Sequence, residues 1–489
     1  MSVSSSSELA KKAVRGLSWN YLSHYSGKIL LLISTIILAR VLSKDEYGVA
    51  GYAFVTISLL DIISDLGIGA ALIYYKDDER AKNTAFWLGL VVGLALFAGT
   101  WLLAPVVAFF FNDDRATAVV RILALTFPLT SLSNIQESLL RKGLDFKRRF
   151  IPDLTRSIGK GLFSVIFALA GFGAWSLVMG HITGIAVSVI VYWLVSPWRP
   201  SFGFATDLMK PLLSYGGGIV AVNALGILIL KVDYLFVGRY MGAEALGVYM
   251  LAFRIPELII LQLCGIVAAK VFFPLFASLR DDPEAIKNAY LSSTRYMALI
   301  TAPLGVGLAI IAEPLIITLF GDKWVEAVPV ARAIALYSLF LALSYNAGDA
   351  YKAQGKTHIL TGISVARLAL LLPALWWAVN SFGTIEAVGW AQCAVALVSG
   401  IISLTVITRM FNISGFSLLA AFHPAFVGSS VMSIAVVLTL SLTAAQPHLL
   451  QLISSVLVGA LSYGVALWWL QRDIILRARK TLRSAFSGR

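Results

Sequence analysis

Twelve Lys and Arg side chains lie within or at the edges of long apolar stretches, where a positive charge is costly. Placing one Lys or Arg against lipid at the centre of a membrane costs about 2.5–3.5 kcal/mol. If half of the twelve are deep, the total exceeds the roughly 5–15 kcal/mol that stabilises a typical domain. We therefore expect these side chains to face a watery cavity, one another or acidic partners. They are Lys28, Arg40, Arg121, Arg156, Lys160, Lys231, Arg239, Arg254, Lys270, Arg295, Arg332 and Arg367.

Helical spacing groups some of these charges on one face. Asp153, Arg156 and Lys160 are three and four residues apart, so a helix places them in one stripe. Asp153 can pair with Arg156, whereas Lys160 lies deeper and has no acidic neighbour in the sequence. Arg254 and Glu257, three residues apart, form a second expected pair. A cation without a carboxylate favours an anionic ligand, and salt bridges between helices remain the alternative.

Five carboxylates in the same stretches are candidates for coupling transport to a proton or sodium gradient, because buried acids can carry protons. They are Asp61, Asp65, Glu137, Asp233 and Asp349. Asp61 and Asp65 share a helical face because they are four residues apart. Asp233 and Lys231 are two apart and cannot face the same cavity. Each acid is equally expected to be the partner of a neighbouring cation.

The elements that carry these charges are membrane-spanning helices. Hydrophobic residues make up 58% of the chain and charged residues only 13%, against roughly 25% charged in soluble domains. A helix rises about 1.5 Å per residue, so about 20 apolar residues cross a hydrocarbon layer about 30 Å thick. The sequence predicts an all-α integral membrane protein. Its about 14 spans lie at 17–42, 47–72, 84–111, 116–140, 150–171, 174–196, 211–239, 245–276, 291–320, 325–350, 359–380, 385–408, 418–444 and 448–471.

The remaining basic residues predict the orientation. Of the 39 Lys and Arg residues, 24 lie in the two tails and in every second gap between spans, and only Lys44, Arg115 and Lys323 lie in the opposite gaps. Because cytoplasmic loops carry the excess of Lys and Arg, both termini are predicted to be cytoplasmic. The net charge of +13 is therefore explained without a nucleic-acid partner.

An internal repeat divides the spans. The segment 38–54 aligns without a gap on 237–253, matching Arg40 with Arg239 and Gly48 with Gly247 at an offset of 199 residues. The offset covers six spans, so both copies enter the membrane in the same direction, as parallel repeats do. We predict a six-helix lobe at 1–196, a cytoplasmic linker at 197–210 and a second six-helix lobe at 211–410, related by a pseudo-twofold axis along the membrane normal. Two further helices and a basic tail occupy 411–489. Glycine pairs such as Gly180 and Gly184 indicate close helix packing.

Three segments carry a family resemblance: ILARVLSKDEYGVAGYA, DYLFVGRYMGAEALGVYMLAFR, and the stretch from FFPLFASLRDDPEAIKNAY to AEPLIITLFGDKW. The chain resembles the polysaccharide-transport members of the multidrug/oligosaccharidyl-lipid/polysaccharide (MOP) exporter superfamily, the Wzx-type flippases. The resemblance implies a flippase of the bacterial cytoplasmic (inner) membrane. Such a protein carries a polyprenyl-pyrophosphate-linked oligosaccharide outward by alternating access, for lipopolysaccharide, exopolysaccharide or capsule.

On that reading, the cavity cations bind the pyrophosphate and sugar headgroup. The candidate binding residues are Lys28, Arg156, Lys160, Arg254, Arg295 and Arg367. Arg suits phosphate through its planar fork of donors, and Lys supplies a mobile point charge. Arg40 and Arg239 lie at outer helix ends, where snorkelling is the better interpretation. Expected partners are the lipid-linked sugar, membrane lipids and other polysaccharide-assembly proteins.

Other function classes are less favoured. A membrane glycosyltransferase or polymerase needs a catalytic loop, and every predicted outward gap is only a few residues long. The chain has no nucleophile–base motif and no spacing of metal ligands, and Cys264 and Cys393 lie inside spans, so we expect no enzyme, cofactor or metal site. A multidrug or cation exporter would need an acidic or apolar cavity. A flippase for the peptidoglycan lipid precursor shares the helix plan and remains an alternative.

Overall fold

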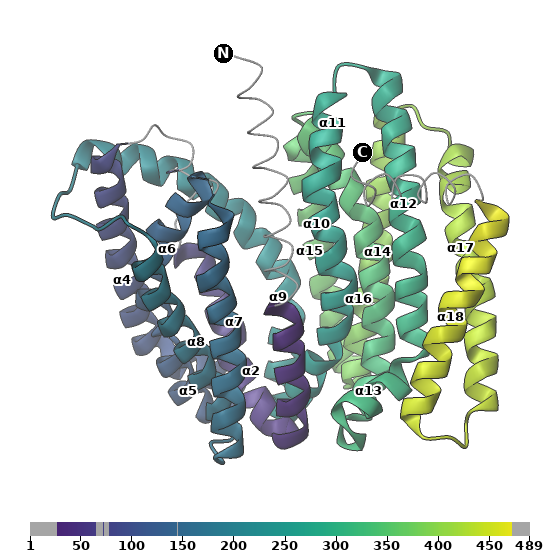
Figure 1. Cartoon of the computed structure of the whole chain (residues 1–489), viewed down its shortest axis with the longest axis horizontal. Coiled ribbons are helices and arrows are strands. Elements are labelled where there is room, and N and C mark those ends of the chain that lie inside the picture. Colours follow the sequence, from purple (N-terminus) through teal and green to yellow (C-terminus); the bar gives the residue numbers. More distant parts are fainter. Residues whose placement is uncertain (1–26, 65–71, 73–77, 144, 472–489) are drawn as a thin grey trace. The chain divides into compact units, whose positions relative to one another are not determined.

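The structure is a computed structural model of the chain, and it describes residues 27–64, 72, 78–143 and 145–471. Every regular element in this part of the chain is a helix (Figure 1). The first half contains a helix over residues 27–41, α2 (Lys44–Ser64), α4 (Glu79–Phe111), α5 (Arg115–Leu123), α6 (Thr126–Lys142), α7 (Phe146–Leu169), α8 (Ala174–Val195) and α9 (Thr206–Pro256). The second half contains η1 (Glu257–Leu261), α10 (Gln262–Val267), η2 (Ala268–Phe272), α11 (Phe273–Ser278), α12 (Pro283–Ile310), α13 (Ala312–Phe320), η3 (Asp322–Trp324), α14 (Ala327–Ala353), α15 (Thr357–Phe382), α16 (Ile385–Met410), α17 (Gly415–Leu442) and α18 (His448–Leu470).

Many of these helices are long and apolar enough to cross a membrane. Within the described residues nine helices meet this test by length and composition, or ten if α12 and α13, bent by 71° at their junction, count as one span. The predicted all-helical, multi-pass architecture is therefore confirmed. Parts of the first two predicted spans, 17–42 and 47–72, fall outside the described residues, and the full number of spans stays a prediction.

Both copies of the repeated sequence interrupt their helix at the same aligned position. In the first copy α2 begins after Ser43, and in the second copy α9 is broken at Gly242, whose φ of 84° lies in the left-handed region. Ser43 and Glu46 form a capping box: the Glu46 N–H donates to the Ser43 hydroxyl (3.2 Å), and the Ser43 N–H donates to the Glu46 carboxylate (2.7 Å). Gly242 reaches the same break through the freedom of a residue without Cβ.

The two copies also touch each other through their aligned glycines. A Cβ on Gly48 would collide with the carbonyl of Ala243, and a Cβ on Gly247 would collide with the carbonyl of Lys44. Lys44 Nζ lies 3.5 Å from the Glu244 carboxylate in the same contact. Because Lys44 aligns with Ala243 and Gly48 with Gly247, each copy presents the same position to the other. Reciprocal contacts of this kind are typical of twofold interfaces.

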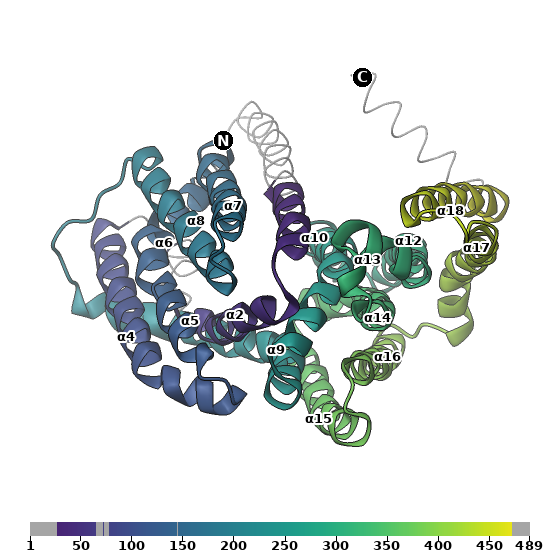
Figure 2. The same cartoon turned by 90° about the horizontal axis from the view of Figure 1, so that it is seen from below.

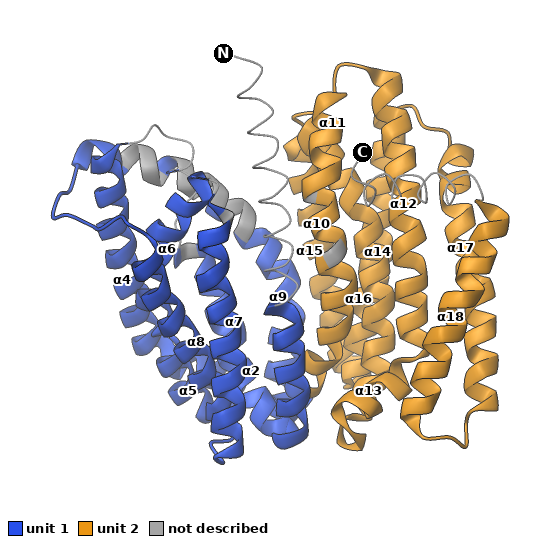
Figure 3. Cartoon of the chain, in the orientation of Figure 1, with its two compact units in different colours: residues 1–247 blue, residues 248–489 orange. Residues whose placement is uncertain are grey.

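The chain forms two compact units, residues 1–247 and 248–489 (Figure 3). In the first unit α7 and α8 approach to backbone contact. A Cβ on Gly180 would collide with Ser164, and a Cβ on Gly184 would collide with the backbone of Lys160. The expectation that these glycines allow close helix packing is confirmed.

The predicted linker 197–210 lies within the first unit and is held against the start of α4. Asn83 and Ser201 exchange two hydrogen bonds, of 2.7 Å and 2.9 Å, across 118 residues of sequence. Trp87 donates to the Ser201 carbonyl (2.9 Å), and Arg80 pairs with Asp207 (3.0 Å). This segment is therefore a fixed part of the unit that precedes it, and the predicted lobe boundaries stay a prediction.

Helices α12, α14, α16 and α17 form the bundle of the second unit, and Figure 2 shows them nearly end-on. The last two helices, α17 and α18, are neighbours, and α17 packs on α12. Their cluster includes Ala298 and Ala302 from α12 and Phe422 and Ala425 from α17. The Tyr463 hydroxyl of α18 donates to the carbonyl of Leu299 at 2.6 Å. The described packing therefore ties both helices into this unit.

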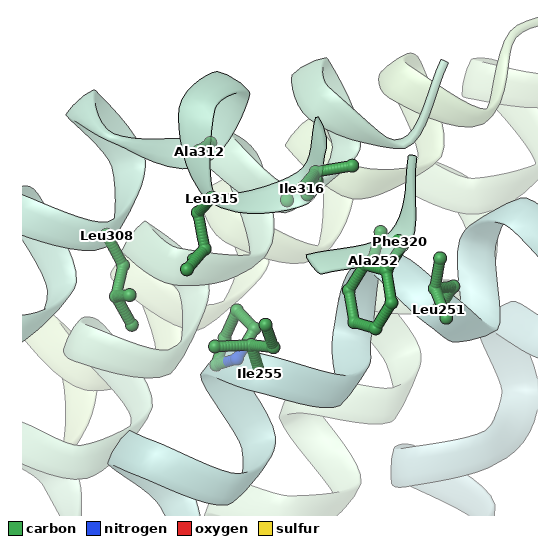
Figure 4. A pocket seen from close by; sticks show the side chains of 10 residues that line it. Leu251, Ala252, Ile255, Leu308, Ala312, Leu315, Ile316 and Phe320 are labelled. Atoms are coloured by element: carbon green, nitrogen blue, oxygen red, sulfur yellow. The ribbon is translucent and has the colours of Figure 1, made fainter. Parts of the chain in front are cut away.

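The bend between α12 and α13 covers a small apolar pocket (Figure 4). Leu308, Ala312 and Leu315 from the bent pair lie around it with Ile255 and Phe320. The space open to water is about 10 Å³, which is about the least that holds one water molecule. This pocket is a packing gap at a sharp bend and is too small for a substrate.

Candidate functional site

Three predicted binding cations of the first unit lie on two helices that pack together. Lys28 belongs to the helix over residues 27–41, and Arg156 and Lys160 belong to α7. A Cβ on Gly161 of α7 would collide with the hydroxyl of Ser34, so the two helices are in close contact. The structure therefore places the three cations on adjoining helices, as two polar stripes.

Lys160 belongs to a cluster that includes a histidine missed by the sequence analysis. Its Nζ lies 5.1 Å from the centre of the Phe54 ring, a cation–π distance. Phe54 packs edge-on to His181 of α8, with ring centres 5.3 Å apart. Lys160 and Arg156 both act electrostatically on His181, and its buried Nδ1 has no hydrogen-bond partner within the described structure. The sequence signal is a polar ring one residue after Gly180, at a close contact between α7 and α8.

Two acids of the first unit, Glu137 and Asp153, pair with Arg149, a residue predicted to lie in a loop. Arg149 Nη2 donates to Glu137 at 2.9 Å, and its Nε lies 3.4 Å from the Asp153 carboxylate. Tyr192 also donates to Asp153, at 2.8 Å. The expected pairing of Asp153 with Arg156 is thus wrong at the level of contact, because Arg149, one turn earlier, takes the carboxylate. In the described part of the chain Arg156 makes no hydrogen bond or ion pair.

The three predicted binding cations of the second unit have no carboxylate partner among the described residues. Arg367 donates to the Tyr337 hydroxyl at 3.2 Å, and its guanidinium carbon lies 5.7 Å from the centre of the same ring. The Nε atoms of Arg367 and Arg295 are buried and form no hydrogen bond. Arg254 and Glu257 do not come within ion-pair distance, so their expected pairing is wrong. Among the described residues these three arginines therefore lack an ion pair, unlike Arg332 and Lys352 of the same unit.

An irregular stretch of helix, η1–α10–η2, packs on the helix that carries Tyr337, the hydrogen-bond partner of Arg367. Two π-helical turns, η1 and η2, flank α10 and pack on α14. A Cβ on Gly265 of α10 would lie 3.9 Å from the ring of Tyr345, which interacts electrostatically with both Arg367 and Glu257. Gln262 in the same segment has a buried amide oxygen without a described partner. Such π turns frequently occur at functional sites because they re-aim side chains.

The other candidate coupling acids lie apart from one another. Asp61 is exposed on α2, and Asp65 falls outside the described residues. Asp233 of α9 is fully buried. Asp349 of α14 is 5% exposed and pairs with Lys352 at 3.1 Å. Their role in coupling stays a prediction.

Two further intramembrane arginines have structural roles. Pro105 cannot donate the helical hydrogen bond to the Trp101 carbonyl four residues earlier. Arg121 Nε donates to that carbonyl at 3.1 Å and stacks on the Trp101 ring at 5.4 Å. Arg239 donates to the carbonyl of Phe110 at 2.7 Å, near the end of α4. Both side chains thus satisfy backbone carbonyls at the ends and bends of neighbouring helices.

The described residues include no group of three or more His, Cys, Asp or Glu side chains that could hold a metal ion. Cys264 and Cys393 are buried, unbridged thiols. What the candidate residues can do chemically is bind an anion through guanidinium and ammonium groups, and hold charge through buried carboxylates.

Comparison with known proteins places this arrangement in context. Residues 37–329 match the profile of a family described as "Polysaccharide biosynthesis protein". The chain is 26% identical over 409 residues to the teichuronic acid biosynthesis protein TuaB of Bacillus subtilis, covering 83% of this chain and 84% of TuaB. It is 25% identical over 488 residues to the succinoglycan biosynthesis transport protein ExoT of Rhizobium meliloti, covering 96% and 95% of the two chains. The lipopolysaccharide biosynthesis protein WzxC of Escherichia coli is 23% identical over 370 residues, covering 75% of each.

Solved structures share the fold. The lipid II flippase MurJ in an inward closed conformation superposes with a TM-score of 0.77 at 16% identity, covering 93% of this chain and 99% of MurJ. An inward-facing multidrug transporter of the MATE family, from the MOP superfamily, superposes with a TM-score of 0.67 at 16% identity, covering 79% and 94%. At this identity the likeness establishes the fold, an all-helical multi-pass membrane architecture. These structural neighbours are transporters.

Proposed function

The chain belongs to the polysaccharide biosynthesis protein family, as its resemblance to the Wzx-type members of the MOP superfamily predicted, and from this premise we propose that it is a flippase. Its cargo is a polyprenyl-pyrophosphate-linked oligosaccharide, which it moves outward across the bacterial cytoplasmic membrane. The product serves surface polysaccharide biosynthesis.

The single observation that carries this proposal is the uncompensated positive charge of the second unit. Arg254, Arg295 and Arg367 lie within or beside spanning helices and have no carboxylate partner among the described residues. All three side chains are partly buried, and a cation removed from bulk water without a partner is destabilised, so contact with an anion or water stabilises the site. A pyrophosphate offers several acceptor oxygens to such guanidinium groups.

The names of the relatives support the polysaccharide class. ExoT is named as a transport protein of succinoglycan biosynthesis, and WzxC and TuaB are named for other surface polysaccharides. The common element is a carbohydrate that must leave the cytoplasm. An enzyme of the same pathway is less favoured, because the described site offers no metal cluster and its neighbours in fold transport their ligands.

The mechanism follows from what the cargo cannot do alone. A pyrophosphate headgroup crossing hydrocarbon would lose its water at a cost of many kcal/mol. In our proposal two six-helix lobes, related by a pseudo-twofold axis and followed by two extra helices, alternate between inward and outward openings within a plan of 14 spans. Arg156 and Lys160 of α7, together with Lys28 of the preceding helix 27–41, contact the headgroup from one lobe. Arg254, Arg295 and Arg367 contact it from the other, while the prenyl chain stays in lipid.

Carboxylates supply the coupling in this scheme. Glu137 shares Arg149 with Asp153, so uptake of a proton by either acid changes the balance of one network. Asp61, Asp65, Asp233 and Asp349 are the remaining candidates for a proton or sodium gradient. Both termini are cytoplasmic in the proposed orientation, and polysaccharide-assembly proteins are the expected protein partners.

A second cargo deserves a direct comparison because the lipid II flippase MurJ has the same fold. The peptidoglycan lipid precursor carries the same chemical elements, a prenyl chain, a pyrophosphate and sugars. The two cargoes differ beyond the pyrophosphate, so the cations alone do not separate them. The transport rates of the prenyl-pyrophosphate oligosaccharide and of the peptidoglycan precursor must therefore be compared.

The experiment is transport by the purified full chain in proteoliposomes. A fluorescent prenyl-pyrophosphate oligosaccharide is placed in one leaflet, and its appearance in the other is followed by quenching. We expect faster translocation than in empty vesicles, and loss of that rate in Arg367→Ala with partial retention in Arg367→Lys. Arg332→Ala is the matched control, because Arg332 is an exposed second-unit arginine paired with Glu313. Equal rates in all proteins and in empty vesicles would refute the function, and faster transport of the peptidoglycan precursor would reassign the cargo.

A further inference from the structure

An apolar groove lies in the first unit, and its lining contains no charged side chain. It has a volume of about 520 Å³, within the range of ligand sites, which is about 300–1,000 Å³. One helical face of α2, one face of α4 and one residue of α9 form its walls. The lining residues are Thr56, Leu59, Leu60, Ala95, Leu96, Gly99, Thr100, Leu103, Val106, Val107, Phe110, Phe111 and Leu235.

The chemistry of these walls fits a hydrocarbon. The only hydroxyl groups belong to two threonines, and that of Thr56 already donates to the Tyr52 carbonyl at 2.8 Å. The Thr100 hydroxyl is buried and unpartnered within the described structure. Sugars and phosphates need several convergent polar groups, so neither belongs here.

The groove opens toward lipid. Its rim residues Leu103 and Val106 are 60% and 59% exposed, on a helix that is long and apolar enough to cross a membrane. Gly99 leaves the middle of the groove wall open, since a Cβ there would meet nothing within 4 Å. A chain entering from the bilayer would exchange one apolar environment for a shaped one and gain dispersion contacts.

A positive charge near one end of the groove favours a lipid with an anionic headgroup. The guanidinium of Arg239 lies 5.8 Å from the centre of the Phe110 ring, and Phe110 lines the groove. A lipid whose chain fills the groove would bring an anionic headgroup close to this partly exposed cation. Leu235 of α9 completes the wall, together with Phe110 and Phe111 at the end of α4.

We infer that this groove holds the prenyl chain of the lipid-linked cargo, an inference that rests on the proposed function. The chain would lie against α2 and α4 with its pyrophosphate end toward Arg239. Holding the chain near the protein raises the effective concentration of the headgroup at the binding cations. The groove is thus a second contact for the same lipid.

Two glycines of α4 give a matched test. Gly99 lines the groove, whereas Gly89 does not, and a Cβ at either position meets nothing within 4 Å. Gly99→Leu puts a side chain into the groove from a position where its Cβ meets no neighbour, and Gly89→Leu makes the same change in composition elsewhere on the helix. The probes are a prenyl pyrophosphate with a diazirine near the end of its chain and a phosphatidylglycerol with a diazirine on its acyl chain. Crosslinked peptides are mapped by mass spectrometry on the purified full-length protein.

We expect the prenyl probe to label α2 and α4 peptides in the unaltered protein. Loss of one shaped chain contact worth about 1.4 kcal/mol corresponds to roughly tenfold weaker labelling in Gly99→Leu, with Gly89→Leu unchanged. Equal labelling of all three proteins, or preferential labelling of these peptides by the phosphatidylglycerol probe, would overturn the inference. Failure of the proposed function appears separately, as absence of cargo transport by the unaltered protein, since labelling is measured without transport.

Discussion

Two partly buried arginines, Arg149 of the first unit and Arg367 of the second, have opposite kinds of partner. In the first unit Arg149 has two carboxylates, Glu137 and Asp153, within 3.4 Å, and Asp153 also accepts a hydrogen bond from a tyrosine. In the second unit Arg367 has a neutral phenol as its described polar partner, and Arg295 has no hydrogen bond in the described structure. An arginine paired with carboxylates stabilises the fold, whereas an arginine without a carboxylate partner can still bind an anion. Arg149 and Arg367 therefore differ in the kind of partner that holds the guanidinium, two carboxylates in one case and a phenol in the other.

Removal of Arg149 is expected to change thermal stability more than any other substitution considered. Arg149→Ala leaves two partly exposed carboxylates without their shared cation. We expect a loss between the roughly 1 kcal/mol of a surface pair and the about 3–5 kcal/mol of a fully buried one. We expect a clearly lower unfolding temperature of the purified protein in detergent, measured by intrinsic fluorescence. The triple variant Arg149→Ala/Glu137→Gln/Asp153→Asn should recover part of the loss. If Arg149→Ala unfolds at the temperature of the unaltered protein, the network has no structural role.

Removing a second-unit arginine should have the opposite signature. Arg295→Ala and Arg367→Ala delete cations that have no acid to strand, so thermal stability should stay within about 1 kcal/mol. Cargo affinity should fall by a factor of ten or more, because a charge-assisted hydrogen bond contributes about 1.5–3 kcal/mol. The measurement is half-saturation of transport in proteoliposomes. A strong loss of stability with unchanged affinity would reverse the assignment.

The phenol that supports Arg367 offers a finer test. Tyr337→Phe keeps the ring beside the guanidinium and removes only the hydroxyl that accepts its hydrogen bond. A single hydrogen bond contributes about 0.5–1.5 kcal/mol net, so we expect a two- to tenfold rise in half-saturation with the maximal rate kept. Tyr345→Phe is the control on the same helix, because no hydrogen bond of its hydroxyl joins it to Arg367. An equal effect of both changes would argue against positioning of Arg367 by Tyr337.

The smallest effect concerns the turn between α4 and α5, where charge is again compensated. Arg115 donates to Asp113 (2.8 Å) and to Asp45, and the bond from Arg115 holds the pKa of Asp113 below its usual value. A lowered pKa in the folded state stabilises the protein above the unfolded pKa, near 3.8, and that contribution is lost as the pH falls through the lowered value. Asp113→Asn should flatten this acid dependence slightly. Unfolding temperatures between pH 5 and pH 3 provide the check, and identical profiles would contradict it.

The sequence was informative where structure follows local spacing. The 199-residue offset aligns Ser43 with Gly242, where both helices break, and Gly180 and Gly184 predict a close contact that the structure contains. A local rule could also have explained Arg121, because Pro105 frees the Trp101 carbonyl four residues earlier.

Contacts between different helices could not be predicted from the spacing of residues along one helix. Glu137 and Arg149 are 12 residues apart across a turn, and Tyr337 and Arg367 are 30 apart on separate helices. Periodicity places a residue on a face and does not say which helix covers that face. The same limit explains why Asp153 seemed to belong to Arg156, its neighbour on one stripe, although Arg149 lies one turn away on the same helix.

The reciprocal contact of Gly48 and Gly247 has a consequence for mutation. Each glycine meets the backbone of the other repeated segment, as equivalent positions do about a dyad. A methyl group added at either position would therefore push the same two segments apart, from one side or from the other. Alanine substitution at the two glycines should thus have similar effects, and the double substitution should cost less than their sum.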